Sequence, residues 1–234
     1  MVTGINASGS TVGVYVDGGG TTHGYTDIGG TFTTVDSPGS AFNQGLGINN
    51  GNTTVGYSSS DATGATGQKA YSQTGGAFTS LDGLLPSNHN SQAVGINNAG
   101  NVVGFYMPTT TTSIGFLDIG GVITTLDPFS STFTQALGID NNGVIVGIYR
   151  DGSGNQYGYI DNGGTYTSID PFGSTNVTVS GLNDLGQIVG FYRDANQHTI
   201  GFVGTPSSVP EPASAALMGA GLLAFAAVLR KKRT

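Results

Sequence analysis

A repeat of about 43 residues runs through most of the chain and constrains its fold more than any other feature. Each copy begins with Gly-[Ile or Leu]-[Asn or Asp], continues through a turn, and reaches a Val-Gly pair that is followed by bulky residues. The copies begin at Gly4, Gly47, Gly95, Gly138 and Gly181, with spacings of 43, 48, 43 and 43 residues. A period of this length indicates one supersecondary unit that packs repeatedly against its neighbours.

The best preserved copy, residues 138–180, contains strand-like segments at 144–149, 157–160, 165–169 and 177–180. Glycines in the intervening turns supply the positive φ that hairpins require. In the first four copies a proline precedes the last segment and marks a loop there: Pro38, Pro86, Pro128 and Pro171. Four short antiparallel strands per repeat are typical of one β-propeller blade, whose faces are covered by the neighbouring blades. A parallel β-helix is the alternative, and the hairpin turns argue against it.

The sequence therefore predicts an all-β repeat domain over residues 1–204, resembling a β-propeller with about five four-stranded blades, some of them incomplete. The predicted strands fall two short of five complete blades when residues 1–3 are counted as a stub. We expect residues upstream of Met1 to supply the missing strands.

Composition supports this fold class and excludes several functions. Only 9% of the residues are charged, 41 are glycine and none is cysteine, so disulfides and thiolate metal sites are excluded. Strand-forming and turn-forming residues replace the usual helix formers. Residues 1–204 contain three basic residues, Lys69, Arg150 and Arg193, against thirteen Asp. A chain without clustered positive charge is not expected to bind nucleic acid.

No arrangement of residues predicts catalysis. The three histidines, His23, His89 and His198, do not have the spacing of a metal-binding pair, and neither a Gly-x-Ser-x-Gly motif nor a P-loop is present. We therefore predict that the protein is not an enzyme. Aspartates recur at turns, where they ordinarily accept hydrogen bonds from nearby backbone amides: Asp36, Asp82, Asp118, Asp127, Asp161 and Asp170.

Two repeated features have both a structural and a ligand-binding interpretation. The loops 140–143, 151–154 and 183–186 offer oxygen ligands for calcium, but the equivalent loops 6–9 and 97–100 contain no carboxylate. We predict turns and no cofactor, with calcium as the alternative. An aromatic residue recurs in the second segment of each copy, where we expect core packing, with sugar-stacking platforms as the alternative: Tyr25, Tyr71, Phe116, Tyr159 and Phe202.

The C-terminus differs from the repeats. Residues 213–229 form an uncharged apolar run, followed at once by Arg230, Lys231, Lys232 and Arg233. A helix over these 17 residues is about 25 Å long, within the lower range for a membrane span. The sequence predicts one transmembrane helix and a basic tail over residues 213–234, with the basic residues acting as a cytoplasmic stop, and a linker over residues 205–212.

Pro210, Glu211 and Pro212 lie immediately before this helix, and Glu211 is the only glutamate of the chain. Pro-Glu-Pro, an apolar helix and a terminal basic cluster together resemble the PEP-CTERM protein-sorting signal of Gram-negative bacteria that make exopolysaccharide. The resemblance implies that an exosortase-type membrane protease recognises these three residues and cleaves near them. A membrane-anchored precursor would then be delivered to the cell surface or extracellular matrix. Such proteins carry a signal peptide, which we expect upstream of Met1.

The repeat resembles the bacterial extracellular repeats that are named for a His-Ala-Phe tripeptide. The matching positions are His23-Gly-Tyr25, Lys69-Ala-Tyr71, Ile114-Gly-Phe116, Tyr157-Gly-Tyr159 and Ile200-Gly-Phe202. This resemblance implies a surface location. We expect an exported structural or adhesion protein, or a protein of the exopolysaccharide matrix, with extracellular polysaccharide as a second candidate partner. The alternatives are a carbohydrate-binding propeller and, third, a surface hydrolase with an Asp-based site.

Overall fold

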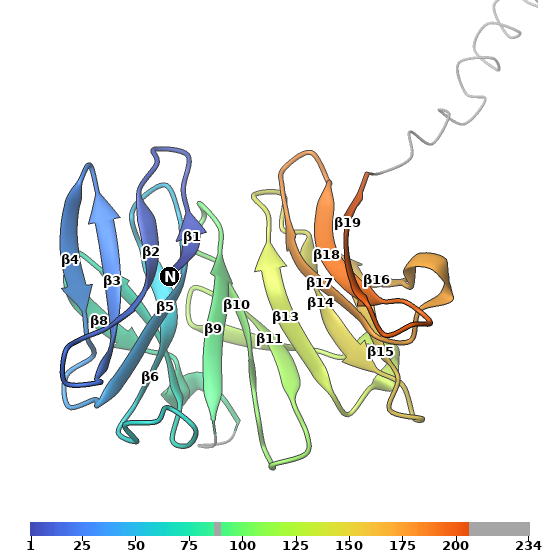
Figure 1. Cartoon of the computed structure of the whole chain (residues 1–234), viewed down its shortest axis with the longest axis horizontal. Coiled ribbons are helices and arrows are strands. Elements are labelled where there is room, and N and C mark those ends of the chain that lie inside the picture. The colour runs from blue at the N-terminus through green and yellow to red at the C-terminus, as the bar shows by residue number, and fades with distance from the viewer. Residues whose placement is uncertain (87–89, 206–234) are drawn as a thin grey trace, which may run out of the picture. The chain divides into compact units, whose positions relative to one another are not determined.

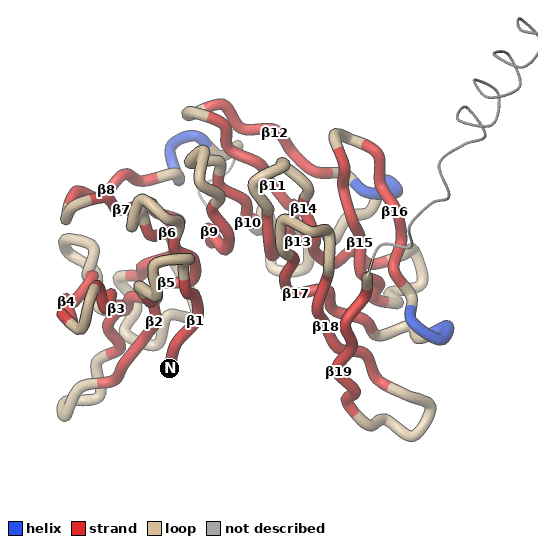
Figure 2. The backbone as a smooth tube through the Cα atoms, turned by 90° about the horizontal axis from the view of Figure 1, so that it is seen from above, coloured by secondary structure: helices blue, strands red, loops and turns tan. Residues whose placement is uncertain are grey.

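The computed structural model describes residues 1–86 and 90–205, and the compact unit formed by Met1–Gly204 is built from strands. The predicted all-β class is confirmed. Figure 2 shows the sheets of this unit following one another along an arc, with the first and the last sheet at its two ends. Within the described residues, no helix has the length and apolar character needed to cross a membrane. The predicted transmembrane helix over residues 213–229 lies outside those residues.

Paired strands that are consecutive in the sequence run antiparallel (Figure 1). The first eight strands form one hydrogen-bonded sheet, which we describe as two four-stranded sheets because only one residue pair joins its halves. The first sheet contains β1 (Val2–Ile5), β2 (Thr11–Val16), β3 (Thr22–Ile28) and β4 (Thr31–Val35). The second contains β5 (Phe42–Ile48), β6 (Thr54–Ser59), β7 (Lys69–Thr74) and β8 (Ala77–Ser80). A single parallel pair between Thr22 and Phe42 connects these two sheets.

The remaining sheets repeat the same order. The third contains β9 (Ser91–Ile96), β10 (Val102–Tyr106), β11 (Ile114–Ile119) and β12 (Val122–Leu126). The fourth contains β13 (Thr134–Ile139), β14 (Ile145–Arg150), β15 (Gln156–Asn162) and β16 (Thr165–Ile169). The last contains β17 (Val177–Leu182), β18 (Ile188–Arg193) and β19 (Thr199–Gly204). Single-turn 3-10 helices lie between sheets: η1 (Asp82–Leu84), η2 (Pro128–Ser130) and η3 (Pro171–Gly173).

The repeat begins within the first strand of each sheet rather than in front of it. Val177–Leu182 pairs with β18, so the predicted fourth segment of one repeat is the first strand of the next sheet. For the same reason Val2–Ile5 is the first strand of its sheet and pairs with β2, and its four residues make it shorter than the six- or seven-residue first strands of the other sheets. The ladders within all the sheets are antiparallel, as hairpins require and a parallel β-helix does not.

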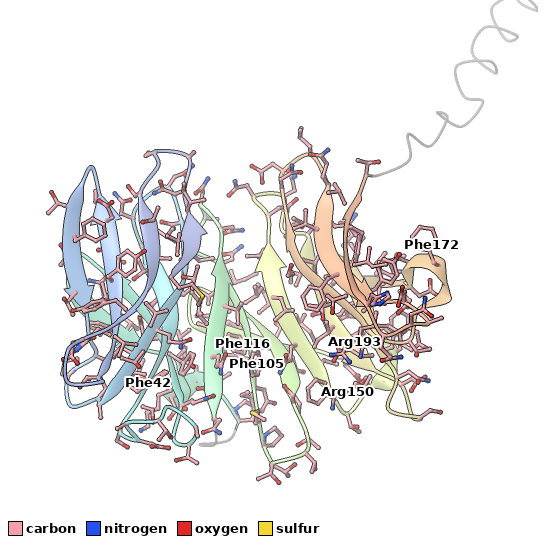
Figure 3. The ribbon with its side chains drawn as sticks, in the orientation of Figure 1. Phe42, Phe105, Phe116, Arg150, Phe172 and Arg193 are labelled. Atoms are coloured by element: carbon pink, nitrogen blue, oxygen red, sulfur yellow. The ribbon has the colours of Figure 1, made fainter. Side chains whose placement is uncertain are left out.

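Neighbouring sheets pack face to face and share their apolar side chains. Val103 from the third sheet packs with Ala136 and Ile145 from the fourth, and Val146 from the fourth packs with Val179 and Ile188 from the last. The predicted core position of the repeated aromatics is confirmed. Tyr25, Tyr71, Phe116 and Tyr159 are buried, and Phe202 packs partly buried against the last of these clusters (Figure 3 labels Phe116).

The glycine of each Val-Gly pair permits a close approach of the first and second strands. A Cβ on Gly147 would overlap the carbonyl oxygen of Gln135, and a Cβ on Gly104 would overlap that of Gln92. The strand register shifts beside these contacts, between Ala136 and Gly138 in the fourth sheet. The glycine therefore recurs because any larger residue would separate the two strands.

Candidate functional site

The residues predicted to direct sorting lie outside the described part of the structure. These residues are the sorting motif Pro210, Glu211 and Pro212 and the basic stop Arg230, Lys231, Lys232 and Arg233. His89 also lies outside the described residues. The roles of the sorting residues therefore stay predictions from the sequence.

The Asp and Asn loops are turns whose side-chain oxygens bind their own backbone. Asp140 Oδ1 accepts from the amides of Asn142 at 2.9 Å and Val144 at 2.8 Å. Asp151 Oδ1 accepts from the amides of Ser153 and Asn155 in the same way, at 2.9 Å each. The side chain of Asn155 also donates to Asp151, and these bonds lower the pKa of the Asp151 carboxyl. These contacts agree with the predicted turn role.

Metal-ligating side chains are not gathered elsewhere in residues 1–86 and 90–205. No group of three or more His, Asp or Glu side chains in these residues could hold a metal ion.

His23 lies between two carboxylates, with Nδ1 at 2.6 Å from Asp36 Oδ2 and Nε2 at 3.3 Å from Asp17 Oδ2. The bond to Asp36 is the main cause that raises the pKa of His23 above its ordinary value. The Tyr15 ring stacks on His23 at a centroid distance of 5.0 Å, so these residues form one side-chain cluster within the first sheet.

A series of side-chain amides, which we call the amide ladder, connects successive sheets. Its members are Asn6, Asn49 and Asn97, each donating from Nδ2 to the main-chain oxygen of the equivalent residue in the next sheet. The distances are 2.9, 3.1 and 3.1 Å. Sequence reasoning identified the repeated Asn but not its partner, because that partner lies a whole repeat further along the chain.

A pocket of about 490 Å³ lies between the outer parts of the fourth and last sheets. Its lining is polar, except for two aromatic rings, and includes Asn155, Phe172, Tyr192, Arg193, Asp194 and Gln197. Phe172 is 91% exposed, and its φ of 56° is a left-handed conformation that the equivalent residue Phe129 shares, with a φ of 59°. Figure 3 shows the Phe172 ring projecting away from the sheets. The pocket thus combines an exposed aromatic ring with guanidinium and amide donors.

Arg193 differs from its counterpart one repeat earlier. The guanidinium of Arg150 lies 3.9 Å from the ring centroid of Phe133, whereas the position equivalent to Phe133 in the next repeat is Asn176. Within the described part of the chain, Arg193 forms no ion pair within 4.0 Å. The guanidinium face that Arg150 places over Phe133 therefore has no equivalent ring beneath it at Arg193.

Phe172 also has fewer aromatic contacts than its counterpart one repeat earlier. Phe129, its equivalent, lies 4.7 Å from Tyr149 and 6.2 Å from Tyr166, a residue of β16. The described part of the last sheet has no fourth strand to supply such a second ring, and Phe172 contacts Tyr192 at 5.7 Å. Sequence reasoning missed this pocket. The available signal was the change from Phe133 to Asn176 at equivalent positions.

The fold is similar to that of fungal proteins of known structure. The crystal structure of AofleA from Arthrobotrys oligospora has 15% sequence identity and a TM-score of 0.51, covering 86% of this chain and 66% of that one. An arginine-to-alanine mutant of AofleA has 16% identity and a TM-score of 0.50, covering 86% and 67%. A lectin from Aleuria aurantia, described as a six-bladed β-propeller with a novel fucose recognition mode, has 12% identity and a TM-score of 0.46, covering 89% and 78%.

The chain thus spans about two thirds of the length of AofleA. At these identities the similarity concerns the fold alone. No curated protein matches the chain in sequence. Residues 208–232 match the PEP-CTERM protein-sorting motif, which confirms that part of the predicted resemblance. The resemblance of the repeat to the His-Ala-Phe repeats stays a prediction.

Proposed function

We propose that the protein is an exported, non-enzymatic surface or matrix protein of a Gram-negative bacterium, processed by an exosortase-type membrane protease. The observation that supports this proposal is the match of residues 208–232 to the PEP-CTERM protein-sorting motif. In this proposal the apolar residues 213–229 anchor the precursor in the membrane, and the basic residues 230–233 remain on the cytoplasmic side. Cleavage near Glu211 then releases the repeat domain to the surface.

The repeat domain is suited to a structural or adhesive role in an exopolysaccharide matrix. Its turn carboxylates, such as Asp140 and Asp151, are engaged by backbone amides and are thereby held in place. An acidic domain of stacked sheets with few charged side chains can serve as a spacer or an adhesive surface without catalysis. The His-Ala-Phe resemblance, with the surface location it implies, belongs to the same proposal.

The sorting proposal is tested by substituting Glu211, the only glutamate of the chain. In an exosortase-containing host, Glu211→Ala should block processing, so that the full-length precursor accumulates in the membrane fraction. Ser207→Ala, just upstream of the matched residues 208–232, is the control and should be processed like the parent chain. Immunoblots of membrane and released fractions measure both. Equal release of the Glu211→Ala variant and the parent would overturn the proposal.

A second candidate function is carbohydrate binding at the pocket between the fourth and last sheets. It is favoured by the 91% exposed ring of Phe172 beside Arg193, which lacks the aromatic contact of its counterpart. Sugars present C–H faces that pack on aromatic rings and hydroxyls that accept from guanidinium and amide donors. The lining residues Asn155, Asp194 and Gln197 add both donors and acceptors.

This candidate is tested with matched variants on a glycan array and with fragments of bacterial exopolysaccharide. If the pocket binds glycan, Arg193→Ala and Phe172→Ala should each weaken binding about tenfold or more, since each removes one contact of about 1.5 kcal/mol. Arg150→Ala and Phe129→Ala are the controls, because those side chains are engaged within the protein, and they should retain binding. Absence of binding by the parent chain, or equal losses in both pairs, would reject the candidate.

A further inference from the structure

Each sheet has two faces, which the packing distinguishes. We call the face that packs against the following sheet the forward face, and the face that packs against the preceding sheet the rear face. Val103 on β10 contacts residues of the fourth sheet, and Val146 on β14 contacts residues of the last, so both lie on forward faces. Side chains two residues further along a strand share the same face.

The forward face of the last sheet has no partner within the described residues. The second strand of each sheet places two side chains on the forward face, two residues apart. The first of them is fully buried in the first four sheets: Val12, Val55, Val103 and Val146. The second is 6–8% exposed at Val14, Tyr57, Phe105 and Ile148. In the last sheet the equivalent residues Val189 and Phe191 are 45% and 43% exposed, and Val203 beside them is 68% exposed. These side chains have the same apolar chemistry as their buried counterparts.

The rear face of the first sheet is uncovered in the same way. Val2 is 57% exposed, whereas its equivalents Ala93, Ala136 and Val179 are fully buried. Ile5 is 67% exposed, whereas its equivalent Ile48 is 8% exposed against the first sheet. The two ends of the arc in Figure 2 therefore present one forward face and one rear face, the pair that meets at every internal contact between sheets.

We infer that these two faces bind one further four-stranded unit of the same repeat, which packs its rear face on the last sheet and its forward face on the first. Four contacts inside the molecule show what covers such faces: three apolar clusters between later sheets, and Val12 of the first sheet against Gly45 of the second. One unit carries both kinds of face, so in this proposal a single occupant covers both ends. A whole second copy would cover one end and leave its own equivalent end to be covered by another copy, so the contact would assemble the protein into head-to-tail rings or chains.

Backbone hydrogen bonds indicate that the two ends are not equivalent. The amides of Asn50, Asn98 and Asn141 each donate to the side-chain oxygen of the equivalent residue in the next sheet, at 2.8–2.9 Å, ending at Asp184. The first member of the series, Ala7, has no side-chain oxygen and cannot accept such a bond from a preceding unit. The added unit is therefore held more strongly by the last sheet than by the first.

The absence of cysteine permits a direct test by thiol accessibility in the full chain. Val189→Cys places a single thiol on the free forward face, and Val146→Cys places one at the buried equivalent position. A copy of residues 134–176, one complete unit, is fused ahead of Met1, and a Gly-Ser segment of equal length is fused as the control. The readouts are the rate of thiol labelling and the molecular mass in solution.

We expect rapid labelling of Cys at position 189 in the parent and in the linker control, and labelling at least tenfold slower in the monomeric fusion. Position 146 should be protected in all three. A second fusion, which carries residues 91–133 instead, guards against misfolding of the first added unit. In either fusion Ala7→Asn should slow labelling further, because it supplies the side-chain oxygen that Ala7 lacks.

Three outcomes would overturn the inference. The first is rapid labelling at position 189 in both fusions while their circular dichroism shows the added strands. The second is protection of this position in the monomeric parent, which would mean that the arc closes on itself. The third is protection of the parent that increases with protein concentration, which would identify a second copy as the occupant.

Discussion

At the scale of single residues, the glycine of the Val-Gly pair controls the distance between the first two strands of a sheet. The position of Gly147 is buried, and the space that a Cβ would occupy is taken by the Gln135 carbonyl oxygen and the ring of Tyr159. A methyl group cannot be accommodated by a side-chain rotation, because the obstructing carbonyl oxygen belongs to the neighbouring strand. The two strands must separate instead, and their hydrogen bonds lengthen.

Gly147→Ala is therefore expected to lower the free energy of unfolding by about 2 kcal/mol or more, the usual cost of overpacking. Gly152 lies in an open turn, where a Cβ meets nothing within 4 Å and φ is not in the left-handed region. Gly152→Ala should change stability by less than about 0.5 kcal/mol, as at most surface sites. Urea denaturation monitored by circular dichroism measures both. Similar small losses in the two variants would contradict this account of the glycine.

At the scale of elements, the amide ladder links turn formation to the packing of sheets. Asn97 is 4% exposed; its Oδ1 accepts from the amides of Ala99 and Asn101, and its Nδ2 donates to the main-chain oxygen of Asp140 at 3.1 Å. One side chain thus closes a hairpin and joins two sheets. Asp140 occupies the equivalent place without an amide donor, and there Asn142 donates to the main-chain oxygen of Asp184 instead.

The two tasks of Asn97 can be separated by substitution. Asn97→Asp keeps the oxygen that accepts from the turn, removes the bond to the next sheet and places a second acceptor oxygen beside the Asp140 carbonyl oxygen, so the expected loss is at least about 1 kcal/mol. Asn97→Ala removes both functions and should cost about 2–3 kcal/mol, because buried backbone amides lose their acceptor. Thermal unfolding of the two variants and the parent distinguishes these cases. A loss near zero in Asn97→Asp would show that the bond between sheets contributes nothing to stability.

The sequence predicts the strands well and their grouping poorly, for a physical reason. Turn residues and apolar alternation are local, so segments such as 144–149 and 165–169 are found nearly where β14 and β16 lie. The local pattern does not determine which strand pairs with Val177–Leu182, because a hairpin with the strand before it or with the strand after it would satisfy the same pattern. The aromatic core positions follow from periodicity, whereas the pocket depends on one change of residue between repeats, Phe133 to Asn176.

At the scale of the whole molecule, the effect of a substitution depends on its place along the arc. Val146 and Val189 occupy equivalent positions in neighbouring sheets, but their exposures are 0% and 45%. A stack of units in which each contacts its neighbours gains most of its stability at the contacts between units. The same side chain therefore stabilises the interior of the arc and adds much less at its end.

Val146→Ala is expected to reduce the free energy of unfolding by about 2 kcal/mol, since it removes buried apolar groups and leaves a cavity. Val189→Ala should cost less than about 0.5 kcal/mol, because nearly half of that side chain is already in water. Chemical denaturation of the two single variants gives the comparison directly. A loss at Val189 as large as that at Val146 would mean that the last sheet is covered in solution.

The spacing of 48 residues between Gly47 and Gly95 has a practical consequence for engineering. Part of the extra length lies in the connection between β6 and β7, residues 60–68, where the fourth sheet uses only residues 151–155. The amide ladder nevertheless crosses this repeat at 3.1 Å, the same distance as in the following one. The chain thus already contains a natural insertion at a hairpin tip that leaves the stacking unchanged. The equivalent tips are suitable positions for grafted peptides, such as epitope tags or binding loops displayed on a bacterial surface.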